Sequence, residues 1–240
     1  MDPKIPIALQ YWNGDRERAL ALSHFLADLE PTHSTQADFL FMARFDSSLD
    51  EPSVRHVSRK FNTYARVSRR RGVGWPCGCN DLWFSVMEWA QSMIQARKIP
   101  HYKAIFTCEA DGCPIQRDWI ARLSSEWDRV NTPKPVVMAG ALVEPGPHIN
   151  GNALMSGELN FLTWIGRRVG GIAAHVGWDF ILRDEFKNRG WADIPGIKSI
   201  YNTPTFTPEQ YQDMINRGWT WIHGGKDTSL IRMGRERFKV

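Results

Sequence analysis

Short runs of apolar residues that alternate with helical patterns constrain the fold of this chain more than any other sequence feature. Such runs occupy residues 5–12 (IPIALQYW), 37–45 (ADFLFMARF) and 102–108 (YKAIFTC), and residues 63–67 are a further candidate. Continuous apolar runs of this length are typical of strands buried on both faces of a parallel sheet. Apolar residues three and four positions apart follow them, as in amphipathic helices. The alternation predicts an α/β domain with a mainly parallel sheet.

The second half of the chain has a less regular pattern. Strands are predicted at residues 135–142 and 197–201, and helices at 158–165, from 178, and at 208–217 with Thr207 as the N-cap. The Asn-Gly pair at 150–151 indicates a tight turn within residues 148–152. No repeat or linker divides the chain. We therefore expect a single domain over residues 1–240, with two halves, about 1–132 and about 133–240.

Two acidic residues, Glu109 and Asp111, follow the apolar run at residues 102–108. Gly112 and Pro114 are expected to stop the strand, and a helical pattern starts near residue 116. Ligands of parallel sheets bind beyond the carboxyl ends of the strands. Carboxylates at such an end suit Mg²⁺ or Mn²⁺, which prefer oxygen ligands and leave positions open for substrate phosphates. Solvated acids at an ordinary strand-to-turn junction are the alternative interpretation.

Other polar and aromatic residues are expected at the same edge of the sheet. Gln10 and Tyr11 end the first strand and are predicted to line a nucleotide site. Arg44 and Asp46 follow the second strand and would contact a base and a ribose, or alternatively form a salt bridge within their loop. Trp75 lies in a glycine-rich loop and is predicted to contact the acceptor by stacking on a sugar or base; packing under that loop is the alternative.

Five short motifs follow one another along the chain. They are Gly78-Cys79-Asn80, Glu109-Ala110-Asp111, His148-Ile149-Asn150-Gly151-Asn152, Gly177-Trp178-Asp179 and His223-Gly224-Gly225-Lys226. Together with the N-terminal α/β pattern, they resemble nucleotide-sugar-dependent glycosyltransferases of the GT-A type over roughly residues 5–230. The H-x-N-G-N stretch resembles one seen in viral/phage and plant enzymes of this kind. The resemblance implies a GT-A-like single domain with a Rossmann-like, nucleotide-sugar-binding N-terminal half and a mixed C-terminal acceptor half.

The resemblance also implies a metal site on the donor side. Asp111 and His223 would hold Mn²⁺ or Mg²⁺ on the diphosphate of a UDP- or GDP-sugar, and Lys226 would contact the phosphates. Glu109 stands where these enzymes usually have an aspartate. Its longer side chain would either ligate the metal or hold the sugar and ribose. Asn80 would contact the donor sugar.

On the acceptor side, the resemblance implies contacts from Asn150, Asn152 and Trp178. If transfer inverts the anomeric centre, a carboxylate must remove the proton of the acceptor hydroxyl, and Asp179 is the predicted catalytic base. As a residue at a helix start, Asp179 would alternatively serve only as a cap.

Both the charge of the chain and its resemblance to viral enzymes bear on the acceptor. The net charge is +4, which permits a phosphate-bearing partner without requiring one. Basic residues Arg59, Lys60, Arg66 and 69–71 alternate with aromatic ones and indicate a nucleic-acid contact. DNA that carries a 5-hydroxymethylpyrimidine base is therefore one hypothesis for the acceptor. A glycan or protein acceptor, and a non-catalytic basic nucleic-acid-binding module, are the alternatives.

Other classes of protein fit less well. A metal-dependent phosphate-ester hydrolase would need more convergent carboxylates and histidines than the sequence offers. The four cysteines do not have the spacing of a zinc ribbon or finger. No apolar run approaches 20 residues, so no membrane span is predicted. We expect a cytoplasmic protein, in the host cytoplasm if it is viral, and the sequence does not indicate an oligomeric state.

Overall fold

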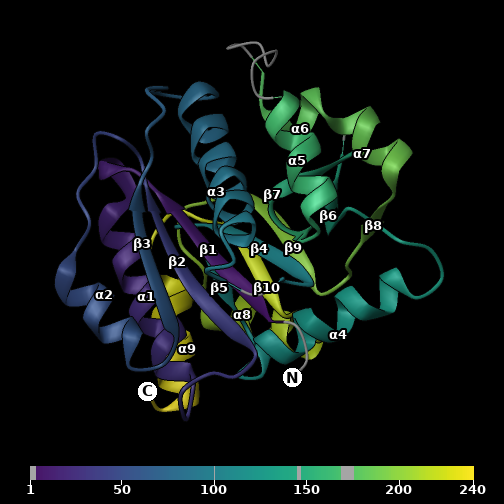
Figure 1. The fold of residues 1–240 in the computed structure, drawn as a ribbon. Coiled ribbons are helices and arrows are strands. Elements are labelled where there is room, and N and C mark those ends of the chain that lie inside the picture. Colours follow the sequence, from purple (N-terminus) through teal and green to yellow (C-terminus); the bar gives the residue numbers. More distant parts are fainter. Residues whose placement is uncertain (1–3, 100, 145–146, 169–175) are drawn as a thin grey trace.

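The computed structural model describes residues 4–99, 101–144, 147–168 and 176–240 (Figure 1). In the first half, strands alternate with helices as predicted. The elements are β1 (Ile5–Tyr11), a 3-10 turn η1 (Asn13–Asp15), α1 (Arg16–Leu29), β2 (Ala37–Ala43), α2 (Glu51–Ser58), β3 (Asn62–Val67), α3 (Cys77–Gln95) and β4 (Ala104–Glu109).

The second half contains shorter elements. They are β5 (Gly112–Pro114), α4 (Trp119–Asn131), β6 (Met138–Val143), β7 (His148–Ser156), α5 (Leu159–Arg168), α6 (Trp178–Ile181), α7 (Arg183–Arg189), β8 (Trp191–Asp193), β9 (Ile197–Thr203), α8 (Pro208–Asn216), β10 (Trp221–Gly225) and α9 (Ser229–Phe238). The helix α8 begins with a capping box in which Thr207 and Gln210 satisfy each other's backbone amides, so the predicted N-cap is confirmed.

Seven strands form the main sheet, in the order β3-β2-β1-β4-β7-β6-β8. The strand β7 runs antiparallel to both of its neighbours, and the other described pairings of this sheet are parallel. The predicted α/β class is therefore confirmed, and the sheet is mixed. β4, from the first half of the chain, pairs with β7, from the second half, so one sheet contains strands from both halves.

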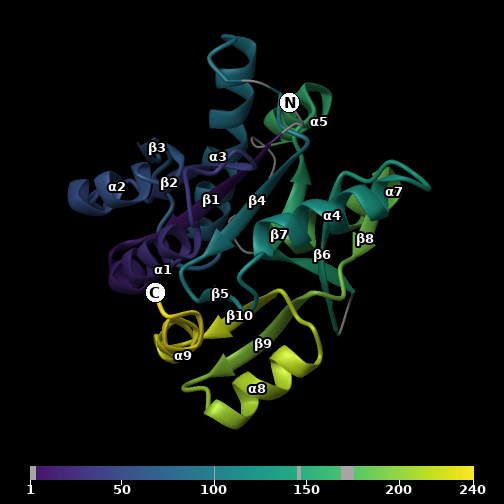
Figure 2. The ribbon, with the colours of Figure 1, turned by 90° about the horizontal axis from the view of Figure 1, so that it is seen from below.

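The apolar runs form strands that are covered on both faces. Along β1, Ile5, Ile7, Leu9 and Tyr11 pack into one core, while Ala8 packs into the other. The first core lies under α1, α2, α4 and α9, and the second lies under α3 and α5 (Figures 1 and 2). A strand with apolar residues on both faces cannot show the alternation of a half-exposed strand, which explains the continuous runs.

A second sheet has the order β5-β10-β9. β10 pairs antiparallel with β5 and parallel with β9. Figure 2 shows this small sheet, with α8 and α9, beside the end of β4. Because β5 follows β4 after a short turn, the small sheet carries the C-terminal residues to the carboxyl end of the main sheet.

One local prediction is wrong and another is incomplete. Residues 148–152 do not form a tight turn; they lie in β7, where Ile149 pairs with Leu142 and His148 with Val143. Cross-strand hydrogen bonds outweigh the local preference of the Asn-Gly pair, and the register shifts opposite this pair. The strand before the acidic pair does stop ahead of Gly112, since β4 ends at Glu109, but Gly112 and Pro114 then form a further strand, β5, that was not predicted. The strands β8 and β10 and the helix α9 were not predicted from the sequence.

Asn152 connects the two sheets. It lies in β7 and its side chain is fully buried. Its Oδ1 accepts hydrogen bonds from the backbone N–H of Glu109 (3.3 Å) and from Nε1–H of Trp221 (3.2 Å). One amide oxygen thus joins β7 to the last residue of β4 and to the first residue of β10.

None of the described helices is both long and apolar enough to cross a membrane.

We expect Asn152→Ala to lower the free energy of unfolding by about 2–4 kcal/mol, because two buried donors lose their acceptor. Urea unfolding measures this change. Asn216→Ala, at an exposed position at the end of α8, is the matched control and should change stability by less than about 0.5 kcal/mol. An equal, small effect of both substitutions would show that the Asn152 side chain does not support the junction.

Candidate metal and donor site

The acidic pair lies at the carboxyl end of β4, where the sequence places it. Glu109 is the last residue of β4 and Asp111 lies in the turn before β5. The carbonyl oxygen of Asp111 accepts hydrogen bonds from the amides of Gly224 (3.1 Å) and Gly225 (3.2 Å). Gly224 has φ +114°, which L side chains rarely adopt. Gly224 and Gly225 therefore hold β10 beside the turn that contains Asp111.

This attachment brings His223 between the two acids. Its Nε2 lies 3.1 Å from Oε2 of Glu109 and 3.1 Å from Oδ1 of Asp111. The ligand atoms of the three residues all lie within 4.8 Å of one another. On the other side of the ring, Nδ1 lies 3.3 Å from Oγ of Ser199, in β9. A partner on the second ring nitrogen orients a metal-binding histidine.

The three residues fit a divalent cation. Oδ1 of Asp111 is buried and, within the described part of the chain, makes no hydrogen bond of normal geometry although it faces His223. A buried carboxylate oxygen without a proper donor is costly unless another group satisfies it. Two carboxylates and one imidazole form a suitable ligand set for Mn²⁺ and, with water and phosphate oxygens, for Mg²⁺.

The electrostatics of the site are dominated by the two acids. Burial disfavours the charged imidazole, but the nearby carboxylates of Asp111 and Glu109 outweigh burial and raise the pKa of His223 to about 10. Burial likewise opposes ionisation of Asp111, yet His223 and Lys226 hold the pKa of its carboxyl well below the usual range. Lys226 lies with Nζ 3.0 Å from Oδ2 of Asp111.

Asp15 is a residue of this site that the sequence analysis did not assign to it. It precedes α1 at the N-cap position, but its Oδ1 accepts the N–H of Trp12 (2.8 Å) and does not cap the helix. Burial raises the pKa of Asp15 to about 6, and the charges of Glu109 and Asp111 contribute in the same direction. An aspartate at a helix start has an ordinary role as a cap, so the sequence alone gives no signal for this acidic neighbourhood.

Other residues predicted for the donor side are held by contacts within the protein. Arg44 donates two hydrogen bonds of 2.7 Å to Asp46, which is the salt bridge that the sequence analysis considered as an alternative. The Arg44 guanidinium also lies 4.8 Å from the centre of the Trp12 ring. Gln10 and Tyr11 are buried, and the Tyr11 hydroxyl donates to the carbonyl of Ser48 (3.4 Å).

Asn80 links the donor half to the acceptor half. Its Nδ2 donates to the carbonyl of Val176 (3.1 Å), and its Oδ1 accepts the N–H of Trp178 (2.8 Å). Trp178 is buried and stacks on Trp83 of α3, with ring centres 4.0 Å apart. Both residues thus hold the segment that enters α6.

Asp179 lies in the first turn of α6, with Oδ2 3.7 Å from Nε2 of His148. Burial raises the pKa of Asp179, and His148 opposes this shift. His148 also packs against the ring of Phe180, with ring centres 4.0 Å apart. Asp179 is therefore a desolvated carboxylate beside a buried histidine, in addition to its place at a helix start.

Two predicted acceptor residues differ in exposure. Trp75 is 75% exposed, so it does not pack under its loop. Asn150 is half-buried, and its Oδ1 accepts the N–H of Asn152 (3.2 Å). Gly151, between the two asparagines, lies beside Glu109. A Cβ on Gly151 would lie 3.4 Å from Oε1 of Glu109, which is an ordinary contact distance. The H-x-N-G-N stretch therefore borders the acidic pair.

No family model matches the chain, and no curated protein sequence matches it. Solved structures do match. An LgtC active-site mutant gives a TM-score of 0.57 at 11% identity, covering 98% of this chain and 94% of that one. A glycosyltransferase involved in glycosylation of the major capsid of PBCV-1 gives 0.54 at 12% identity and covers 99% of both chains. The bifunctional glycosyltransferase WbbM gives 0.60 at 9% identity; the match covers 99% of this chain and only 50% of that one.

A further matching structure is named as a synthase and not as a glycosyltransferase. A 4-diphosphocytidyl-2C-methyl-D-erythritol synthase gives a TM-score of 0.50 at 11% identity, covering 90% of this chain and 98% of that one. Identities this low show the fold and leave the activity to be argued from the site. The chain has an α/β fold of the GT-A type, with a mixed seven-stranded sheet and a small sheet formed with the C-terminal residues.

Proposed function

We propose that this protein is a metal-dependent glycosyltransferase that moves a sugar from a UDP- or GDP-sugar to a hydroxyl acceptor. The observation that carries the proposal is the meeting of Glu109, Asp111 and His223 at the carboxyl end of β4. In a GT-A-type fold this edge is where a nucleotide-sugar diphosphate and its metal would bind. Residues of about 1–132 would supply most donor contacts, and those of about 133–240 most acceptor contacts.

The metal site would stabilise the departing diphosphate. Bound Mn²⁺ or Mg²⁺ would supply a Lewis acid there. Glu109, Asp111 and His223 would hold the ion, and Ser199 would keep the imidazole in place. Lys226 is 46% exposed, so its ammonium can leave Asp111 and add a positive charge to the phosphates.

Other predicted donor residues support the site in different ways. Arg44 and Asp46 hold each other at the end of β2 and would present a fixed edge to the base and ribose. Gln10 and Tyr11 are buried, so we assign them a role in shaping the nucleotide site from beneath. Asn80, although directed toward the segment 176–178, would keep the start of α3 close to the donor sugar.

On the acceptor side, Asp179 would accept the proton of the attacking hydroxyl. A carboxylate with a raised pKa is a stronger base than an ordinary one, and burial supplies this shift. Trp178 and Asn152 are buried, and we assign them to positioning the residues beside them. Asn150 and the exposed Trp75 remain available for direct contact with the acceptor.

For the acceptor, we keep a 5-hydroxymethylpyrimidine base in DNA as one proposal. Arg66 and Arg69 support it, since both are exposed and no side chain of the described residues pairs with either. Arg70 is less available, because it pairs with Glu88 and Asp81. A glycan or a protein is the alternative acceptor, and a non-catalytic nucleic-acid-binding role is the alternative to transfer.

The direct test combines Mn²⁺, a panel of UDP- and GDP-sugars and three acceptor pools, namely hydroxymethylated DNA, glycans and proteins. We expect release of a nucleoside diphosphate and added sugar mass on one pool, detected by mass spectrometry. Asp111→Asn should lower the rate by more than about 100-fold, because it removes a metal ligand. Asp213→Asn, at an exposed position in α8, is the control and should keep full activity. Sugar transfer at the wild-type rate by Asp111→Asn would contradict the metal assignment.

The affinity for Mn²⁺ should rise with pH. The raised pKa means that His223 carries a proton at pH 7, and a metal ion must displace that proton to reach Nε2. The apparent Kd for Mn²⁺ should therefore fall by about tenfold per pH unit between about pH 6.5 and 8.5. Calorimetry in two buffers of different ionisation enthalpy should report release of about one proton per ion.

The metal-free protein gives the matching control for this pH dependence. Its stabilisation by protonated His223 is complete below the ordinary histidine pKa of about 6.5 and is lost as the pH rises through about 10. His223→Gln should weaken Mn²⁺ binding and remove the pH slope. A slope that persists in this variant would place the displaced proton on another group.

Asp179→Asn should slow transfer by about 100-fold or more while donor and metal binding stay within about twofold, because only the base is lost. Single-turnover rates and nucleotide-diphosphate titrations separate the two effects. Asp184→Asn, in the first turn of α7 and fully exposed, is the control. Retention of the anomeric configuration in the product would remove the need for this base.

A further inference from the structure

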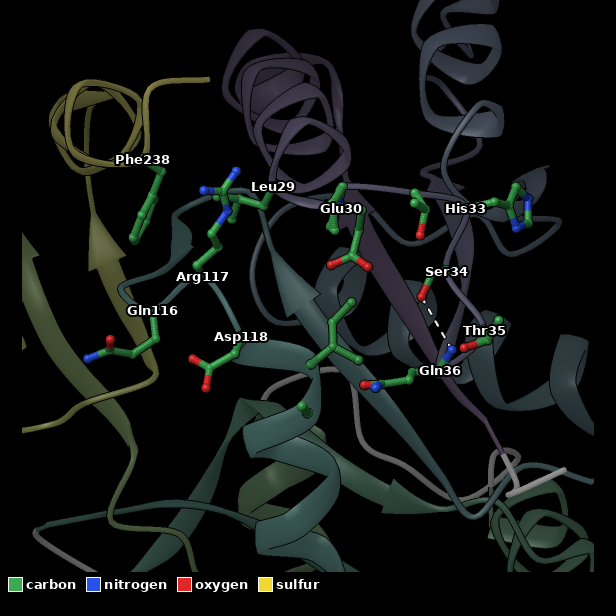
Figure 3. Close-up of a pocket in the computed structure, with 14 residues that line it drawn as sticks. Leu29, Glu30, His33, Ser34, Thr35, Gln36, Gln116, Arg117, Asp118 and Phe238 are labelled. Carbon is green, nitrogen blue, oxygen red and sulfur yellow. Dashed lines mark hydrogen bonds between the residues drawn. The ribbon is translucent and has the colours of Figure 1, made fainter.

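A cavity of about 550 Å³ lies beside the end of α1 and the beginning of α4 (Figure 3). It is open to solvent on one side and is lined by the end of α1, residues 31–36, the segment that leads into α4 and Phe238 of α9. Gln36 immediately precedes β2, and its carbonyl accepts the N–H of Ile5 at the start of β1. The cavity therefore borders the amino ends of β1 and β2, whereas Glu109 ends β4 at the opposite edge of the sheet.

Some of the polar side chains that line this cavity make no ion pair or side-chain hydrogen bond with the described residues. Figure 3 shows the Glu30 carboxylate directed into the space, with Arg117 and Gln116 on the opposite wall. No ion pair involves Glu30 or Arg117, and no hydrogen bond involves the side-chain amides of Gln36 and Gln116, among the residues that the structure describes. Burial raises the pKa of Glu30, because desolvation outweighs the lowering effects of the hydrogen bond with Ser34 and the charge of Lys60. These groups together offer both hydrogen-bond acceptors and donors to a ligand.

The cavity also has an apolar surface. Leu29, Ile120 and Phe238 line it. A pyranose ring has this same division, with hydroxyl groups that both donate and accept at its edge and C–H groups on its faces. The volume lies within the range of small-ligand sites.

The lining disfavours other kinds of ligand. The Glu30 carboxylate opposes an anion such as phosphate, and the side-chain amides of Gln36 and Gln116 oppose a purely apolar molecule. No group of three potential metal-ligand side chains occurs here within the described residues. A neutral, hydroxyl-rich ligand satisfies both the polar and the apolar parts of the lining.

We propose that this cavity is a saccharide-binding site separate from the transfer site, with Glu30 and Arg117 as its principal hydrogen-bonding groups. The proposal does not depend on the transferase activity, because it concerns binding at the other edge of the sheet. If the acceptor is a glycan, a second site would raise its effective concentration near the enzyme.

The test titrates the ¹⁵N-labelled protein with maltose, cellobiose, lactose, chitobiose, mannobiose and xylobiose, and follows amide shifts by NMR. We expect at least one disaccharide to shift the amides of residues 29–36 and 116–121. Glu30→Gln keeps the side-chain shape and should raise Kd by about tenfold, because a hydrogen bond to a charged group is lost. Arg117→Ala, at an exposed position, should do the same without affecting folding.

Two controls make the outcome decisive. Glu51→Gln, on the exposed face of α2, and Asp111→Asn, in the metal site, should both leave disaccharide binding unchanged. Absence of binding by all six sugars, equal affinity in Glu30→Gln and Arg117→Ala, or loss of binding in Asp111→Asn would each overturn the proposal. Failure of sugar transfer with saccharide binding intact would instead count only against the proposed activity.

Discussion

The hydrogen bonds from the amides of Gly224 and Gly225 to the carbonyl of Asp111 join the two segments that carry the candidate metal ligands. They join β10, near the C-terminal end of the described chain, to the turn that leaves β4. His223 reaches the acids because it is the central residue of β10 and pairs with Gly112 of β5. The pairing also requires glycine at position 112, because a Cβ there would lie 2.5 Å from the ring of Trp221. Backbone pairing between short strands therefore positions the ligand set, and the side chains themselves contribute little to their own placement.

The same arrangement concentrates charge. The charges of Glu109 and Asp111 add to the raised pKa of Asp15, and His223 and Lys226 supply the neighbouring positive charge. Like charges that share a partly desolvated site destabilise it unless a cation neutralises them. In the metal-free protein a proton on His223 does this, and a divalent ion would replace that proton. The raised pKa of His223 and the buried, poorly satisfied Oδ1 of Asp111 are therefore two consequences of one condition, a site with more negative charge than its fixed cations balance.

How well the sequence predicts the molecule depends on how much of each element is encoded locally. β1, β2 and β4 were predictable because each is apolar on both faces, and Thr207 was predictable because a capping box is a local pattern. β5 and β10 were not, since each is short and includes glycine, and their structure depends on pairing with each other and, for β10, with β9. The Asn-Gly pair of β7 was misread as a turn for the same reason: cross-strand partners decided its conformation. For the site, the residue types of Glu109, Asp111 and His223 indicated their chemistry, but their meeting depends on that long-range pairing.

The donor half and the acceptor half are separate along the sequence, but each half positions residues of the other. Asn80, at the start of α3, binds the backbone on both sides of Gly177, and Trp83 of the same helix stacks on Trp178. Asp179 therefore owes its position to a helix of the first half. Asn152, from the second half, in turn fixes the backbone of Glu109. Each half thus holds a reactive residue of the other, so a displacement of α3 would move the proposed base, and a displacement of β7 would move a proposed metal ligand. Such reciprocal support keeps the distance between the proposed metal and base constant, which in-line transfer between two bound substrates requires.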